Sequence, residues 1–106
     1  MEELSRTSIA NILDPDPASS GKAAVFIYTP LCGTCKLAAR MLEIVEQMLP
    51  GLPLYQVNIN AMPELAEKWQ VTSVPGLYLV ERGVIAEKHF ALHSVDFLYQ
   101  QLKSFF

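Results

Sequence analysis

The chain has 106 residues, 51% of them hydrophobic and 18% charged, with a formal net charge of −3. This composition is typical of a compact globular domain that buries roughly 65% of its unfolded surface, and it excludes a disordered chain. The slightly acidic balance lacks the basic excess of a phosphate-binding surface, so we expect no nucleic-acid partner. We expect residues 1–106 to form a single domain.

The first 21 residues, MEELSRTSIANILDPDPASSG, lack the basic and apolar regions of a signal peptide. The longest apolar run, residues 23–28, is far shorter than the ~20 residues that cross a bilayer. We therefore expect a cytoplasmic protein with no membrane partner. Because thiols are kept mostly reduced in that compartment, its two cysteines are expected to be catalytic or metal-binding rather than structural.

Apolar spacing predicts three elements in the first half of the chain. Residues 5–13 have the spacing of a short helix, and the apolar run at residues 23–29 is typical of a strand buried on both faces. A long helix begins near Cys32 and ends before Pro50. Its apolar positions recur every three or four residues and are expected to face the core: Ala38, Met41, Leu42, Val45, Met48 and Leu49.

The second half predicts two strand regions and two helices. Alternation at residues 54–60 indicates a strand parallel to the first, because a helix crosses between them. Pro63 begins a short helix to about Lys68, residues 76–80 and 84–90 form a hairpin, and Ser94 caps a last helix. The order predicts an α/β fold whose central mixed sheet has about four strands, with helices on both faces.

Cys32 and Cys35 are the only cysteines, separated by Gly33 and Thr34, and the sequence allows three interpretations of this pair. As a structural disulfide they would close a loop so short that it restrains the unfolded chain by only roughly 2 kcal/mol. As half of a zinc site they would need His89 and His93. Those histidines are too far along the chain for a zinc-finger spacing and are predicted to lie in a strand and in the turn after it.

The third interpretation is thiol-disulfide exchange. The attacking group in that reaction is a thiolate, and the N-terminus of a helix stabilises an anion through its free N–H groups and its dipole. Lys36 adds a cation nearby. Cys32 would then be the exposed attacking sulfur, and Cys35, one turn into the helix, would resolve the mixed disulfide. Gly33 leaves room for a partner chain to approach.

With these residues the chain resembles the thioredoxin family from Ala23 to its end. The resemblance rests on the buried strand, the CGTC motif opening a helix, and the "SVPG" segment 40 residues after Cys35. It implies that Cys32 attacks and Cys35 resolves, and that Pro75 is a cis-proline. It also implies that Leu31, Val74, Pro75 and Gly76 bind an extended segment of the substrate, by adding it as a strand.

The chain departs from the usual pattern of that family at several positions. Leu31 stands where a tryptophan is typical, and Thr34 where a proline is typical. Phe26 stands where the family has a buried aspartate that helps the resolving thiol lose its proton, and Gln56 stands at the lysine often paired with that acid. We expect slow deprotonation of Cys35, weak general reductase activity and a more oxidising couple than in a typical thioredoxin.

The resulting hypothesis is a monomeric protein-disulfide reductase with no bound cofactor and no metal. Its expected partners are proteins with disulfides or mixed disulfides and a reductase that donates electrons. Two alternatives stay open: glutaredoxin-like reduction of glutathione mixed disulfides, and a docking or thiol-sensing module without turnover.

Overall fold

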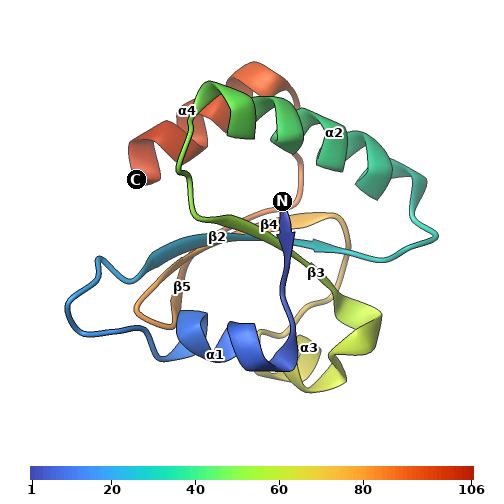
Figure 1. Cartoon of the computed structure of the whole chain (residues 1–106). Coiled ribbons are helices and arrows are strands. Elements are labelled where there is room, and N and C mark those ends of the chain that lie inside the picture. The colour runs from blue at the N-terminus through green and yellow to red at the C-terminus, as the bar shows by residue number, and fades with distance from the viewer.

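The computed structural model describes residues 1–106 as a five-stranded sheet between two layers of helices (Figure 1). The strands are β1 (Glu2–Glu3), β2 (Lys22–Tyr28), β3 (Leu54–Asn58), β4 (Gly76–Glu81) and β5 (Val84–His89). The helices are α1 (Arg6–Leu13), α2 (Gly33–Met48), α3 (Pro63–Lys68) and α4 (Val95–Phe105), with a short 3-10 turn η1 (Ile59–Ala61). Helices α1 and α3 cover one face of the sheet, and α2 and α4 cover the other.

The strand order is β1-β3-β2-β4-β5, and the first three of these strands are parallel. Strand β4 runs antiparallel to both β2 and β5, so the sheet is mixed as predicted. The structure adds one strand to the four expected, since the two-residue β1 pairs with β3 at the edge. Sequence patterning did not predict β1, because two exposed glutamates carry no apolar alternation.

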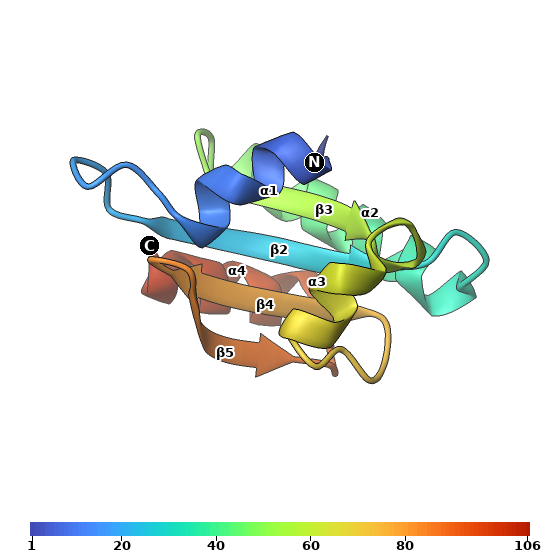
Figure 2. The same ribbon diagram turned by 90° about the horizontal axis from the view of Figure 1, so that it is seen from below.

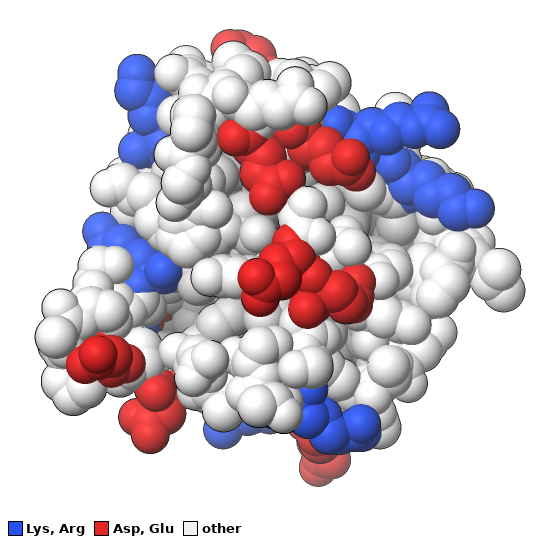
Figure 3. Space-filling view, in the orientation of Figure 1, with Lys and Arg blue, Asp and Glu red and all other residues white.

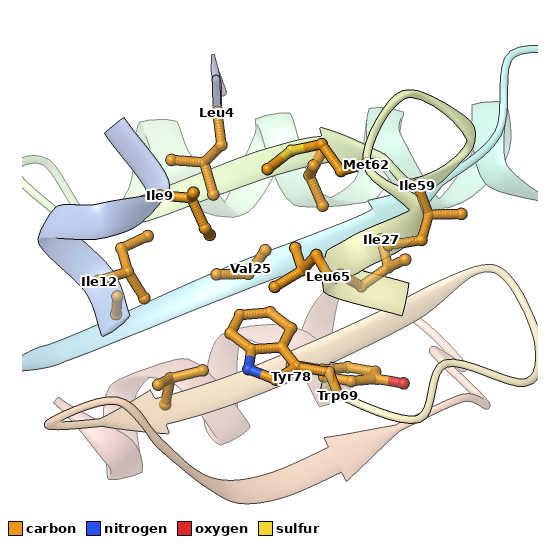
Figure 4. Packing of buried hydrophobic residues seen from close by; sticks show 13 residues of the cluster. Leu4, Ile9, Ile12, Val25, Ile27, Ile59, Met62, Leu65, Trp69 and Tyr78 are labelled. Carbon is orange, nitrogen blue, oxygen red and sulfur yellow. The ribbon is translucent and has the colours of Figure 1, made fainter. Parts of the chain in front are cut away.

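The central strand β2 separates two hydrophobic clusters. Five of its seven residues are buried, which explains its nearly unbroken apolar sequence. Val25 and Ile27 point toward α1 and α3, where Trp69 stacks on Tyr78 with ring centroids 5.7 Å apart (Figure 4). Ala24 and Phe26 join the opposite cluster beneath α2 and α4, which contains Cys35.

The predicted hairpin is confirmed, and its turn is as short as the sequence suggested. Arg82 and Gly83 connect β4 to β5 with φ values of 51° and 79°, the left-handed pair that matches the twist of the two strands. A side chain at position 83 would collide with the carbonyl oxygen of Leu13 at the end of α1. Glycine is therefore required there by both its backbone angle and its close neighbour.

Helix α2 presents a narrower buried stripe to the sheet than its sequence predicts. Cys35, Ala38, Leu42 and Val45 are buried, and the spacing of three or four residues continues to Leu49 at the C-cap. The expectation that Met48 lies on this stripe was wrong, since Met48 is 49% exposed. It stands one position off the stripe at the last residue of the helix, where the core ends. None of the helices is long and apolar enough to cross a membrane.

Candidate active site

The predicted site residues come from two loops at one end of the sheet. Strand β2 leads into the loop that carries Cys32, and the loop after α3 leads into β4 at the same end (Figure 2). The register explains this arrangement, because Ile27 near the end of β2 pairs with Gly76 at the start of β4. The antiparallel pairing therefore brings Pro75 to the end of the sheet from which the CGTC segment departs.

Cys32 is the N-cap residue of α2. Its backbone is extended, with φ −89° and ψ 112°, and its sulfur accepts a hydrogen bond from the N–H of Cys35 at 3.2 Å. The Thr34 hydroxyl lies 3.3 Å from the same sulfur. An N-cap residue normally uses an oxygen to accept from the free N–H groups of the first turn, and here the sulfur of Cys32 takes that role.

These contacts lower the pKa of the Cys32 thiol. The largest effect is the hydrogen bond from the Cys35 side chain, followed by that from the Thr34 side chain, and backbone N–H groups of the same turn add to them. Each donor stabilises the thiolate more than the thiol. The main source is thus the CGTC turn at the start of the helix, while Lys36, which was expected to add a cation nearby, has an exposed side chain and is not among the causes of the shift.

Cys35 lies directly beneath Cys32 and is only 2% exposed. The pKa of its thiol is raised to about 11, first by burial and then by its interaction with Cys32, while a backbone hydrogen bond from Thr29 acts in the opposite direction. Both cysteines are free thiols. The pair is therefore polarised, with an acidic sulfur at the surface and a protonated sulfur in the core.

The residues expected to bind the substrate chain differ in how deeply they are buried. The Val74-Pro75 bond is cis, as the family resemblance implied. Val74 is half-buried and packs against the cluster that contains Cys35, and Gly76 is buried at the start of β4. Leu31, by contrast, is 97% exposed and contacts no core cluster.

A small cleft of about 80 Å³ leads to Cys35 from the side of β3. Phe26 forms part of its wall, is 1% exposed, and belongs to the same cluster as Cys35. Gln56 lines the cleft as well. The site beneath the cysteines is therefore apolar at position 26, as the sequence predicted, but a polar side chain reaches it from β3.

His89 and His93 take part in packing. Both rings meet Phe97 edge-on, with centroids 5.8 and 4.6 Å away, and His89 also contacts Glu87 at 3.2 Å. No group of three or more His, Cys, Asp or Glu side chains is arranged to hold a metal ion.

Sequence reasoning missed two features of this site. It noted Thr34 only as standing where a proline is typical, although a hydroxyl two residues after an N-cap cysteine is well placed to donate to its sulfur. It also gave no role to Glu3. The carboxylate of Glu3 accepts hydrogen bonds from the side chains of Tyr28 and Gln56, which lie far away in the sequence.

Comparison with known proteins supports the reading of this geometry. The family model described as Thioredoxin matches residues 10–104. The thioredoxin-like protein YusE of Bacillus subtilis is 44% identical over 79 residues, or 74% of each chain, and the thioredoxin of Chlamydia trachomatis is 31% identical over 83 residues, or 78% of this chain and 81% of that one. The oxidised thioredoxin of Plasmodium falciparum shares the fold, with a TM-score of 0.81 at 18% identity over 99% of this chain and 97% of that one. With a cysteine pair at the start of α2 and a cis-proline before β4, the chain belongs to the thioredoxin family.

Proposed function

We propose that the chain is a thiol-disulfide oxidoreductase that exchanges two electrons with disulfides of partner proteins through Cys32 and Cys35. The observation that carries the proposal is the Cys32 sulfur at the N-cap of α2. It accepts the N–H of Cys35 at 3.2 Å, and the Cys35 thiol lies beneath it. A stabilised thiolate above a protonated reserve thiol is the arrangement that two successive exchange steps require.

In the first step the Cys32 thiolate attacks one sulfur of the partner disulfide. A mixed disulfide forms, and the other partner sulfur leaves as a thiolate. In the second step Cys35 loses its proton and attacks the Cys32 sulfur, which releases the second partner sulfur and leaves a Cys32–Cys35 disulfide. The partner gains two electrons and the chain loses two, so a reductase must return them for another cycle.

The partner is expected to dock as an extended segment along Val74, Pro75 and Gly76, with Leu31 as an apolar contact. Backbone hydrogen bonds to an extended segment give affinity without a strict sequence requirement, which suits a reductase that acts on several proteins. We propose that this takes place in the cytoplasm, where thiols are kept mostly reduced. The chain acts as one thioredoxin-like domain, and as a monomer.

The decisive experiment compares two substrates with the same sample. Protein-disulfide reductase activity predicts that the dithiol form reduces insulin faster than it reduces a glutathione mixed disulfide, although more slowly than a typical thioredoxin does. The opposite preference would favour the glutaredoxin-like alternative. A Cys35→Ser variant cannot complete the second step, so it should accumulate mixed disulfides with several cellular proteins. Failure to reduce either substrate, with no trapped partner, would contradict an enzymatic role and favour a docking module.

A further inference from the structure

The second exchange step raises a question that the cysteine pair alone does not answer, namely where the proton of Cys35 goes. Its thiol is 2% exposed, and the aromatic ring of Phe26 packs in the same cluster. The cleft of about 80 Å³ beside it is lined by Cys35, Tyr28 and Gln56 among others. That volume exceeds the roughly 15 Å³ that one water needs, so the cleft has room for a water beside Cys35, although most of its lining is apolar.

The carboxylate of Glu3 contacts two residues that line this cleft, Tyr28 and Gln56. The Tyr28 hydroxyl donates to Oε1 of Glu3 at 2.7 Å, and the side-chain amide of Gln56 donates to the same oxygen at 3.0 Å. The backbone N–H of Asn58 donates to the other oxygen, Oε2, at 3.1 Å. Strand β1 makes this possible, because its register sets Glu3 directly opposite Gln56 on β3.

We propose that Glu3 is the acceptor of the Cys35 proton, and that the proton reaches it through water in the cleft and the Tyr28 hydroxyl. This inference rests on the proposed function. As the Cys35 sulfur attacks Cys32, its S–H proton passes to the water, the water gives a proton to the Tyr28 oxygen, and Tyr28 gives its own proton to Glu3. Glu3 is exposed and then releases the proton to solvent. Glu3 acts through Tyr28 and is a positioning residue for this step.

Tyr28 is suited to hand a proton on without keeping a charge. Burial first, and then its hydrogen bond to Glu3, raise the pKa of this phenol to about 12. The oxygen therefore holds a proton before and after each transfer. The ring of Tyr28 is fixed from below by stacking on Phe26, with centroids 6.0 Å apart and planes 12° from parallel.

The other charged groups around this path are few. Lys36 of α2 is the only charged residue lining the cleft, and Glu46 of the same helix pairs with the amino group of Met1 at 3.1 Å. Glu2 lies next to Glu3 in β1, where it pairs with Tyr55 rather than with Gln56. Acidic side chains gather on the face seen in Figure 3, over α2 and the edge formed by β1 and β3.

The test follows the two steps separately. One equivalent of the aromatic disulfide dithiobis(nitrobenzoate) is mixed with the reduced protein. The first coloured nitrobenzoate thiolate is released when Cys32 attacks, and the second when Cys35 attacks the Cys32 sulfur. The Glu3→Gln variant should keep the rate of the first release and slow the second by about tenfold at neutral pH. This is less than the about 10²- to 10⁴-fold effect of a general base in direct contact, because Glu3 acts through a relay.

The pH profile separates a proton acceptor from a merely structural residue. With Glu3 replaced, hydroxide must remove the Cys35 proton, so the second release should become about tenfold faster for each pH unit between roughly pH 6 and pH 8. The wild type should show a shallower rise. Tyr28→Phe, which keeps the stacked ring, should behave like Glu3→Gln, and Glu3→Asp should recover part of the rate.

Glu2→Gln removes the neighbouring carboxylate of the same strand and serves as the matched control, with both releases unchanged. Equal slowing in Glu2→Gln and Glu3→Gln would overturn the proposal, as would a second release in Glu3→Gln with the rate and pH profile of the wild type. Absence of the first release in the wild type would contradict the proposed function itself, so the two failures are distinguishable.

Discussion

Replacing Tyr78 with phenylalanine should stabilise the fold. Tyr78 is fully buried between Trp69 and Phe90, and its hydroxyl has no hydrogen-bond partner. Leaving a buried hydroxyl unpaired costs about 1 to 3 kcal/mol relative to water. Tyr78→Phe removes this cost and keeps both ring contacts, while the lost packing of one oxygen offsets part of the gain. We expect the free energy of unfolding to rise by about 1 kcal/mol, and the melting temperature by about 4 to 8 °C.

The assay is urea and thermal unfolding of the reduced protein, followed by the fluorescence of Trp69, the only tryptophan of the chain. Its ring stacks on Tyr78, so its signal reports on this cluster. Tyr99→Phe, at a half-buried position on α4, is the matched control and should leave stability unchanged. A Tyr78→Phe variant that is less stable than the wild type would refute the reasoning, because it would mean that the hydroxyl stabilises the native state.

Three further predictions concern the cysteines and one turn. Thr34→Val should raise the pKa of Cys32, because it removes the hydroxyl 3.3 Å from the Cys32 sulfur, and Thr34→Ser should restore the lower pKa. The pKa is measured by thiolate absorbance against pH. An unchanged pKa in the valine variant would contradict this role of Thr34. Alkylation should modify Cys32 at neutral pH and Cys35 only as the pH approaches about 11, because the thiolate is the reacting form and burial keeps Cys35 protonated. Mass spectrometry measures the alkylation rate of each cysteine. Equal rates for the two cysteines at neutral pH would argue against a polarised pair. Gly83→Ala should lower the free energy of unfolding by more than about 1 kcal/mol in urea titration, because position 83 has φ 79° and no room for a side chain. An unchanged free energy of unfolding would mean that the turn rearranges freely.

Regular apolar periodicity made most of the secondary structure predictable. The run at residues 23–29 matches β2 with a shift of one residue, and the helix predicted from Pro63 to Lys68 matches α3. Strand β1 escaped prediction because Glu2 and Glu3 owe their conformation to pairing with β3 rather than to their own preferences. A pairing between segments more than fifty residues apart leaves no local pattern.

Part of the candidate site could likewise be predicted from the sequence, and part could not. The spacing of Cys32 and Cys35 at the start of a helix already predicted that the two sulfurs lie on one side of the first turn, because residues three apart share a helix face. The same local pattern did not predict that the Thr34 hydroxyl lowers the pKa of Cys32, and it predicted a contribution from Lys36 that is not among the causes of the shift. Which donors reach the Cys32 sulfur depends on side-chain rotamers in the first turn, and the sequence does not specify these.

The amino-acid sequence was enough to predict an α/β fold with a pair of reactive cysteines at the start of its longest helix. These features arise from local patterns of apolar spacing, helix ends and turn residues. The surroundings of the buried thiol depend instead on how the strands assemble. The mixed sheet brings β1, β2 and β3 side by side, so Glu3, Tyr28 and Gln56 meet next to the Cys35 cleft although they are distant along the chain. Hydrogen bonding between such segments depends on strand register, which is fixed only when the whole sheet assembles.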